Sequence, residues 1–425
     1  MTDPPGFGRI VRTLRHRNYR IYVSGNAVSL VGNWMQRIAV GWLTWQLTES
    51  GFWLGLMACA EFLPAVLLGP FGGVLADRFD RLRIIIVVQS FAFCQAVALF
   101  ALTALGLMTI ELLAMLVLAN GVVLGIYQPS RLALVFNLLP REDLSTGIAI
   151  NSIVFNLARF LGPALAGVII VGSGIAGAFA ANAASYLAFL IALSCIRLSQ
   201  ASAPSGGTAE GTARPSIAQQ LGEGIRYAAR HRGIGPMLLL LSIASLGVRP
   251  FVDLLPGFAD AVFAGGAETL ALLSSSVGIG AVVSGAWIAR RGGGGLTRLI
   301  LIATLLMALA VVAFAATSVL WFATLSATFA GMCMVATGVS MQTLMQLSVD
   351  SAMRGRVLSL YSTVFIGGPA AGALIMGAAS ELVGLRAPLL GGAALVLLVW
   401  IGIWRRRLAI AEAMEPGPRV TSPAS

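Results

Sequence analysis

The chain has 425 residues, of which 58% are hydrophobic and 11% are charged, and its formal net charge is +11. Soluble domains carry about 25% charged residues, so this composition excludes an ordinary water-soluble protein. All 28 basic residues are arginine. The absence of lysine excludes an ATPase with a Walker A loop, because that loop holds phosphate groups with a lysine.

Long apolar runs predict twelve membrane-spanning helices, since about 20 helical residues cross a bilayer core of about 30 Å. The predicted spans cover residues 19–47, 52–76, 84–106, 110–135, 147–172, 175–196, 235–261, 267–289, 297–317, 319–347, 357–380 and 387–404. The expected fold class is therefore an all-α polytopic membrane protein.

The arginine residues are distributed unevenly between the predicted loops. They gather in the N-terminal segment and in alternate loops, and the opposite loops contain a single arginine, Arg386. Those opposite loops instead hold the acidic residues Glu49, Glu111, Asp260, Glu268 and Glu381. Cytoplasmic loops carry the excess of positive residues. This pattern predicts that both termini are cytoplasmic, and it explains the net charge without any nucleic-acid partner.

The chain divides into two predicted bundles joined by a linker. A basic cytoplasmic N-terminus (1–18) precedes a six-helix bundle (19–198), and a linker (199–233) precedes a second six-helix bundle (234–407) and a disordered tail (408–425). Within the linker, residues 199–212 are rich in Ala, Ser and Gly. Residues 217–230 place Ile217, Leu221, Ile225 and Ala228 on one face of an amphipathic helix, which predicts an interfacial helix.

The two predicted bundles share polar patterns at equivalent positions. Residues 26, 29, 33 and 37 of the first span recur 216 positions later in the seventh. The pairs are Asn26/Ser242, Ser29/Ser245, Asn33/Arg249 and Arg37/Asp253. In each span the spacing keeps the four residues on one helical face. Gly162-Pro163 of the fifth span likewise recurs as Gly368-Pro369 in the eleventh. Such parallel repeats are typical of one class of membrane transporter.

The turn Gly69–Arg83 between the second and third spans resembles the loop signature of the major facilitator superfamily. Gly73, Asp77, Arg78 and Arg81 match that signature, whereas Asp80 stands where the signature has glycine. The resemblance implies a latch in which Asp77 contacts a neighbouring helix of the other half. The alternative is a solvated turn with cytoplasmic arginines. The equivalent turn of the second half has no acid.

The resemblance extends over residues 10–408, and the chain is similar to the bacterial secretion-effector branch of the superfamily, which includes enterobactin exporters. The segments that carry this similarity include Arg17–Arg20, Trp34–Arg37, Leu75–Arg78, Pro140–Asp143, Asn156–Arg159 and Arg354–Ser359. Gly162, Pro163 and Gly167 resemble the fifth-span motif of the superfamily's antiporters, with Ala158 in place of one glycine. Asn120 lies where many drug/proton antiporters have an arginine in the fourth span.

Five charged residues lie inside predicted spans, where charges are energetically costly and usually functional. Arg37 and Glu61 both lie roughly 13–14 Å from the predicted extracellular end, at 1.5 Å per helical residue. They can therefore meet, either as a static ion pair or as a pair in which Glu61 titrates. Arg249 and Asp253 are four residues apart and can neutralise each other within one helix. Arg159 has no local partner, which makes it a candidate for substrate contact.

From these residues we predict the following site. Glu61 and Asp253 are candidates for proton coupling. The candidates for the substrate cavity are Asn33, Arg37, Arg159, Arg249 and Tyr127. The five charges sum to +1, which favours an anionic substrate. No metal site and no cofactor are expected.

The predicted function is proton-coupled export of a small amphiphilic molecule, siderophore-like or drug-like, by alternating access. The resemblance implies the export direction and a location in the bacterial inner membrane. The expected partners are the lipid bilayer, protons and a small-molecule substrate, and the expected protein is a monomer and not an enzyme. The alternatives are an importer or flippase for a nutrient or lipid, and a non-transporting membrane protein with a signalling or structural role.

Overall fold

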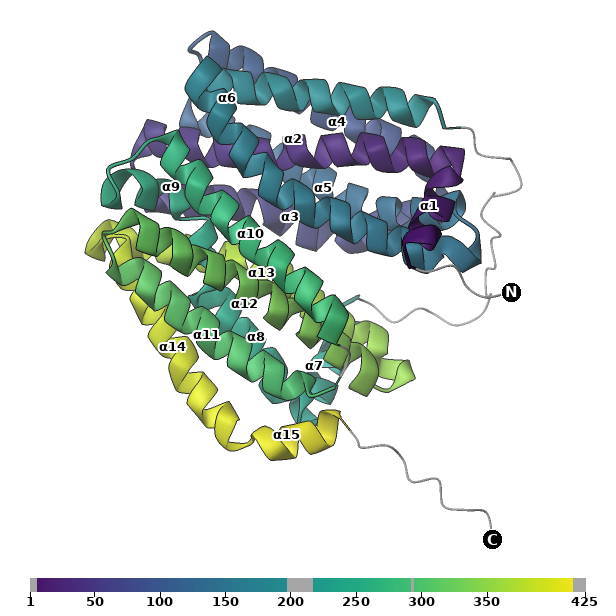
Figure 1. Ribbon diagram of the computed structural model, residues 1–425, viewed down its shortest axis with the longest axis vertical. Coiled ribbons are helices and arrows are strands. Elements are labelled where there is room, and N and C mark those ends of the chain that lie inside the picture. Colours follow the sequence, from purple (N-terminus) through teal and green to yellow (C-terminus); the bar gives the residue numbers. More distant parts are fainter. Residues whose placement is uncertain (1–5, 197–216, 292–293, 416–425) are drawn as a thin grey trace.

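The computed structural model describes residues 6–196, 217–291 and 294–415, and these ranges form helices without any strand (Figure 1). Side chains are not described for residues 6, 7, 70, 73, 74, 76, 77, 132, 133, 217–221 and 352. The first half contains α1 Gly6–Arg15, α2 Arg17–Thr48, α3 Gly51–Arg78, α4 Arg81–Ala104, α5 Ile110–Leu138, η1 Arg141–Asp143 and α6 Leu144–Ser194. The second half contains α7 Ile217–Arg230, α8 Ile234–Gly247, η3 Arg249–Val252, α9 Leu255–Gly257, η4 Phe258–Val262, α10 Ala267–Arg291, α11 Leu296–Ala316, α12 Leu320–Ser348, α13 Ser351–Val383, α14 Arg386–Arg405 and α15 Arg407–Met414.

Ten helical stretches in the described residues are long and apolar enough to cross a membrane. One of them, α6, covers both the fifth and the sixth predicted spans, which join at a kink where Gly174 has φ 75°. Glycine reaches this left-handed conformation without a steric penalty. The first predicted span is α2, which is not among the ten. With α2 added and α6 counted twice, the helices correspond to the twelve predicted runs, and the all-helical polytopic fold class is confirmed.

Short polar side chains fix where several of these helices begin. Ser50 and Thr109 cap the first turns of α3 and α5. The Asp80 carboxylate accepts hydrogen bonds from the backbone N–H groups of Leu82 at 2.8 Å and Arg83 at 3.2 Å, and so caps α4. A cap of this kind stabilises a helix by about 1 kcal/mol. The acid that departs from the superfamily's glycine thus has a local structural role.

The ends of the molecule differ in their loops. We call the end that carries α1, α7 and α15 the arginine-rich end, and the opposite end, which carries Glu49, Asp260 and Glu381, the acidic end. Figure 1 shows α1, α7 and α15 at the same end of the helices. At this end α1 is held by Arg12, whose Nη2 lies 2.6 Å from Asp143 Oδ1, and α7 is held by Arg356, whose Nη1 lies 2.8 Å from Glu223 Oε2.

The apolar core is shared between the halves only in part. One cluster of buried residues around Tyr19, Tyr22 and Phe189 belongs to the first half alone, and one around Ile300, Met341 and Tyr361 belongs to the second half alone. A third and larger cluster contains residues of both halves. The halves are therefore packed together over one part of their length and have separate cores elsewhere.

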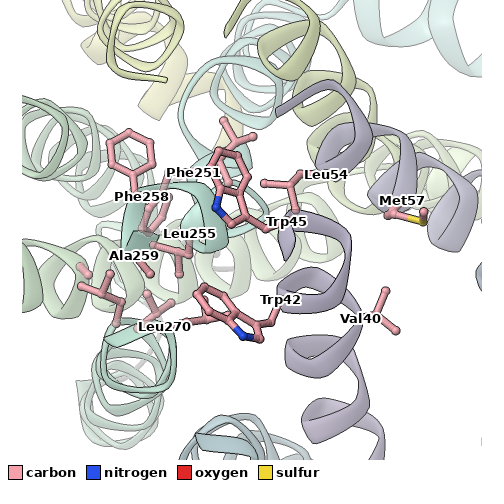
Figure 2. Packing of buried hydrophobic residues seen from close by; sticks show 14 of the residues in the cluster. Val40, Trp42, Trp45, Leu54, Met57, Phe251, Leu255, Phe258, Ala259 and Leu270 are labelled. Carbon is pink, nitrogen blue, oxygen red and sulfur yellow. The ribbon is translucent and has the colours of Figure 1, made fainter. Parts of the chain in front are cut away.

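The shared cluster lies near the acidic end and is built around two tryptophans of α2. Figure 2 shows the indole rings of Trp42 and Trp45 pointing from α2 towards the second half, where Leu255, Phe258 and Leu270 lie. The two side chains are 6% and 5% exposed. Trp45 Nε1 also donates a hydrogen bond to Asp260 Oδ2 at 2.9 Å. This cluster closes the space between the halves at the acidic end.

Contacts between α3 and α13 add to this closure. Glu381 Oε1 accepts hydrogen bonds from Ser50 Oγ at 2.8 Å and from the Phe52 N–H at 3.1 Å. A Cβ atom added to Gly55 would collide with the Ala373 carbonyl group, so the two backbones touch. Between described residues, hydrogen bonds joining the two halves lie in the middle of the molecule or at the acidic end. The conformation is therefore closed at the acidic end.

The ends of the bundles agree with the predictions in part. The helix at 217–230 is present as α7, in which Ile225 is 58% exposed and Gly224 and Ala228 are buried, and its contact with the membrane interface stays a prediction. The predicted tail at 408–425 is not disordered at its start, because residues up to Met414 form α15. Ile410 and Met414 are buried, and their spacing of four residues places them on one helical face. Residues 199–212 and 416–425 lie outside the described part of the chain.

Candidate functional site

Arg37 lies in the middle of α2 and contacts two carboxylates. Its Nη2 lies 2.7 Å from Asp253 Oδ1, and its Nε lies 3.7 Å from Glu61 Oε2. Glu61 belongs to α3 of the same half, whereas Asp253 follows η3 in the other half. The guanidinium also lies over the Phe62 ring, 4.7 Å from its centroid. The predicted meeting of Arg37 and Glu61 is present, and Arg37 in addition joins the two halves.

The predicted pair between Arg249 and Asp253 does not form. The α-helix α8 ends at Gly247, and the chain continues as the 3-10 helix η3, which contains Pro250. In this geometry a spacing of four no longer places two side chains on one face. Asp253 is bound to Arg37 instead. Arg249 Nη1 donates to Ser245 Oγ at 3.3 Å and to the Phe365 carbonyl oxygen at 3.0 Å.

A cavity of about 90 Å³ lies around the Arg37 guanidinium. Four charged side chains line it, two basic and two acidic, so their charges sum to zero when all are ionised. The polar and charged residues of the lining are Asn33, Gln36, Arg37, Glu61, Gln95, Asn120, Arg159, Asp253 and Ser274. Leu54, Met57, Val117, Leu270 and Val277 supply apolar wall. Both halves contribute, so the cavity is a central site between them.

Arg159 projects from α6 into this lining. Its Nη2 has Met334 Sδ as hydrogen-bond partner at 3.9 Å, and its Cζ lies 5.5 Å from the centroid of the Trp34 ring. Arg37 lies at the same distance of 5.5 Å from that ring. Within the described residues, no carboxylate lies within ion-pair distance of Arg159. The prediction that it faces the cavity therefore agrees with its position.

Two predicted cavity residues lie elsewhere. Arg249 is outside the lining, and its Cζ is stacked 4.0 Å from the centroid of the Phe365 ring. Tyr127 is also outside, because its hydroxyl donates to Asn26 Oδ1 at 3.1 Å within the first half. Both sit on faces that turn towards neighbouring helices of their own bundle. Of the predicted candidates for the cavity, Asn33, Arg37 and Arg159 line it, together with both candidates for proton coupling.

The antiporter-like motif places α6 between two neighbours. A Cβ atom added to Gly162 would collide with the Trp34 side chain of α2, and one added to Gly167 would collide with the Ala271 side chain of α10. Pro163 lines the cavity. The glycines therefore allow α6 to approach its own half on one side and the other half on the opposite side.

The predicted latch is only partly visible. The side chains of Gly73 and Asp77 lie outside the described residues. Arg78 is exposed, and Arg81 Nη1 donates to Asn137 Oδ1 at 2.8 Å. This bond joins the turn to α5 of the same half. The contact with the other half stays a prediction.

Sequence reasoning missed a buried amide network beside the cavity. Asn182 Nδ2 donates to Gln36 Oε1 at 2.7 Å, and Gln36 Nε2 donates to Gln95 Oε1 at 3.3 Å. The three side chains connect α2, α4 and α6, and Gln36 and Gln95 also line the cavity. Amides inside apolar spans were the available signal, because a buried amide needs partners. The network therefore connects α2, the helix that carries Arg37, to α4 and α6.

Comparisons with known proteins agree with this picture. Residues 11–424 match the family model described as transmembrane secretion effector. The staphyloferrin A transporter of Staphylococcus aureus (strain NCTC 8325 / PS 47) is 25% identical over 180 residues, which are 42% of this chain and 45% of that protein. Macrolide efflux protein A of Streptococcus pyogenes is 20% identical over 262 residues, 62% of this chain and 64% of that protein. The chain thus spans less than two thirds of the length of these relatives.

Solved structures share the whole fold. The nucleoside transporter NupG (D323A mutant) superposes with a TM-score of 0.70 at 13% identity, over 93% of this chain and 99% of that one. A bacterial homolog of the human lysosomal transporter Spinster, in an inward-facing and unoccupied conformation, gives a TM-score of 0.68 at 14% identity, over 96% and 99%. At such low identity the likeness shows the fold alone.

Proposed function

The chain belongs to the transmembrane secretion effector family of major facilitator transporters, and from this premise we propose that it exports a small amphiphilic molecule in exchange for protons. The family confirms the expected resemblance and makes the protein a transporter and not an enzyme. One contact supports the proposed mechanism above all: the ion pair of 2.7 Å between Arg37 and Asp253, which joins the two halves at the cavity.

The coupling step follows from this contact. An ionised Asp253 holds Arg37 and, through it, the first half. Protonation of Asp253 removes its charge and weakens the bond, because a charge-assisted hydrogen bond is about twice as strong as a neutral one. The halves are then freer to rock. Glu61, 3.7 Å from Arg37, is positioned to take over the guanidinium during that movement.

The direction of transport depends on the topology. The positive-inside rule favours a cytoplasmic arginine-rich end and cytoplasmic termini in a bacterial inner membrane. The acidic end, closed by Trp42, Trp45 and Glu381, then faces outward. When the halves part at the cytoplasmic end, a cytoplasmic molecule would enter the cavity as protons leave Asp253 or Glu61 on the same side. The protein would work as a monomer, because one chain supplies both halves of the site.

The substrate class rests on the cavity wall and on the relatives. The lining combines four charged side chains with Trp34 and aliphatic residues, a mixture suited to an amphiphile with a polar group. The names of the relatives, a staphyloferrin A transporter and a macrolide efflux protein, support a siderophore-like or drug-like cargo. An importer or a lipid flippase is the rival, and the direction of net movement separates them.

The test is an efflux measurement with matched variants. Cells with and without the protein are loaded with a panel of siderophores, macrolides and dyes, and efflux is followed before and after a protonophore is added. We expect export of at least one compound to stop with the protonophore. It should also fall at least 100-fold in Asp253→Asn and to a lesser extent in Glu61→Gln. Export that persists with the protonophore or in both variants contradicts proton coupling, and net uptake contradicts export.

A further inference from the structure

Arg159 is a cation in the cavity wall that lacks an anionic partner among the described residues. The two carboxylates of the lining, Glu61 and Asp253, are both engaged by Arg37. The hydrogen-bond partner of Arg159 is the thioether sulfur of Met334 at 3.9 Å, and a thioether is a weak acceptor. An unpaired charge away from water is unfavourable, so this guanidinium is poised to receive an anion.

We propose that Arg159 binds a carboxylate of the transported molecule, an inference that rests on the proposed transport function and names its substrate class. The planar guanidinium can donate two parallel hydrogen bonds to a carboxylate. Met334, with its flexible chain, can move aside when such a group arrives. Binding of an anion there leaves the Arg37–Asp253 pair intact, so recognition and proton coupling use different arginines.

A molecule bound at Arg159 would also contact apolar and aromatic side chains of the cavity. The Trp34 ring lies 5.5 Å from Arg159 Cζ, and Leu270 and Val277 of α10 also line the cavity. An aromatic or aliphatic body placed on this wall removes apolar surface from water. The inferred substrate is therefore an amphiphile that carries a carboxylate next to an apolar group.

The test uses a probe pair that differs in one charge. Dansylglycine and dansylglycinamide share the same aromatic group, and their binding to the purified protein at pH 7 can be measured by energy transfer from tryptophan to dansyl. We expect the acid to bind at least tenfold more tightly than the amide. Arg159→Gln should weaken binding of the acid about tenfold and change the amide less than twofold, whereas Arg159→Lys should keep part of the preference. Arg298→Gln, an exposed site at the arginine-rich end, is the matched control.

Three results would overturn the proposal: equal affinity for the two probes, no saturable binding of either, or an acid preference that survives in Arg159→Gln. The assay has no proton gradient and no membrane sidedness. A protein whose efflux proves insensitive to a protonophore can therefore still discriminate the acid from the amide, and the two failures are distinguishable.

A second observation concerns Arg249, which lies outside the cavity. Pro369 has no N–H group, so the carbonyl of Phe365, four residues earlier in α13, has no partner in the helix. Arg249 Nη1 donates to that oxygen at 3.0 Å, and its Cζ is 4.0 Å from the Phe365 ring centroid. We infer that Arg249 is a positioning residue that replaces the hydrogen bond lost to Pro369.

The same contact connects three helices of the second half. The Phe365 ring is stacked on Tyr361, with centroids 5.3 Å apart, and the Tyr361 hydroxyl donates to the Gly338 carbonyl of α12 at 2.8 Å. Arg249 itself lies in η3, just after the break in the seventh span. The broken span, α13 and α12 are thereby held as one unit beside Asp253.

Hydrogen–deuterium exchange of α13 in the purified protein tests this role. Arg249→Met should raise exchange of residues 361–368 about tenfold, and Arg249→Lys, which keeps one donor, should raise it less. Pro369→Ala restores an N–H to the helix, so the increase caused by Arg249→Met should fall to less than threefold in that background. Pro163→Ala, in the equivalent position of the first half, is the control and should give no rescue.

Exchange that is unchanged in Arg249→Met contradicts the role of Arg249, as does an increase that Pro369→Ala leaves in place. If Arg249→Met lowers the yield of folded protein too far, the yield becomes the readout. Rescue of that yield by Pro369→Ala and not by Pro163→Ala then supports the inference, and the same yield in both backgrounds overturns it.

Discussion

The fifth and eleventh spans carry the same Gly-Pro pair at equivalent positions, yet the two prolines have different surroundings. Pro163 leaves the Arg159 carbonyl of α6 without a helical partner, and a Cβ added to Gly278 of α10 would lie 3.0 Å from that oxygen. Pro369 leaves the Phe365 carbonyl of α13 free, and Arg249 of the same half binds it. The carbonyl freed by Pro163 thus faces the other half, whereas the one freed by Pro369 is bound inside its own half.

The first and seventh spans differ in a similar way. α2 is one continuous helix of 32 residues, whereas its counterpart is divided into α8, η3, α9 and η4. Arg37 and Asp253 occupy equivalent positions, 216 residues apart, and bond to each other. The two copies of the repeat have therefore acquired opposite charges at the position where they meet. The repeat therefore accounts for the helices that the two halves share, whereas the differences between the halves account for the charged residues of the cavity.

The largest effect is expected from the bond between the equivalent positions. Asp253→Asn leaves Arg37 with Glu61 at 3.7 Å as its remaining carboxylate, and loss of a hydrogen bond to a charged group costs about 1.5–3 kcal/mol. We expect a clear drop in the melting temperature of the purified protein. The charge-exchange variant Arg37→Asp/Asp253→Arg should recover part of the loss, because the positions are equivalent. If the double variant melts no higher than the less stable of the two single variants, Arg37→Asp and Asp253→Arg, the positions are not interchangeable.

The next largest effect is expected from two glycine substitutions, one at a contact inside the second half and one at a contact between the halves. Gly372→Ala introduces a methyl group next to Pro250, with a built Cβ 2.6 Å from Pro250 Cγ, inside the second half. Overpacking of this kind costs about 1–3 kcal/mol, so the melting temperature should fall by several degrees. Gly278→Ala adds a methyl group between the halves, 2.8 Å from Phe160 Cα. It should change cysteine accessibility of the cavity more than thermal stability. If the two variants show the same changes in melting temperature and in cysteine accessibility, contacts within and between the halves do not differ in this way.

Part of this site could be predicted from the sequence, and part of it could not. Hydropathy located the spans, and depth alone brought Arg37 and Glu61 together, because both quantities follow from counting residues along a helix. The pair between Arg249 and Asp253 was wrong because the count assumed an unbroken helix, although Pro250 directly after Arg249 signalled a break. The Arg37–Asp253 bond depends on how the halves pack. Hydropathy carries no information on that packing, and only the equivalence of the two positions hinted at it.

A smaller effect is expected at the acidic end, where hydrogen bonds join the halves. Glu381→Gln weakens the bonds from Ser50 Oγ and the Phe52 N–H, each of which contributes about 0.5–1.5 kcal/mol. The closed arrangement should become less populated. A cysteine at Ser274, in a background without the four native cysteines, should react faster with a membrane-impermeant maleimide applied from the acidic side. Unchanged labelling would mean that the tryptophan cluster suffices for closure.

The smallest effect is expected at the turn Gly69–Arg83, which carries the acid Asp77 at the signature position. The equivalent turn of the second half has no acid. Asp77→Asn should slow turnover about two- to threefold without changing substrate preference, if the latch implied by the resemblance operates. Asp80→Asn is the matched control, since asparagine caps a helix as well as aspartate does. Accessibility of the cavity from the arginine-rich side should change in Asp77→Asn only. Equal behaviour of the two variants would reduce the turn to a solvated loop.

The small size of the central cavity has a thermodynamic consequence. Its volume of about 90 Å³ is well below the roughly 300–1,000 Å³ of pockets that hold drug-sized ligands, so such a molecule binds only to the fraction of the population in which the halves have moved apart. The apparent dissociation constant then equals the intrinsic one divided by that fraction. Changes at Glu381 or Gly278 would shift the apparent affinity of every cargo in parallel. Changes at Arg159 would alter the order in which cargoes rank.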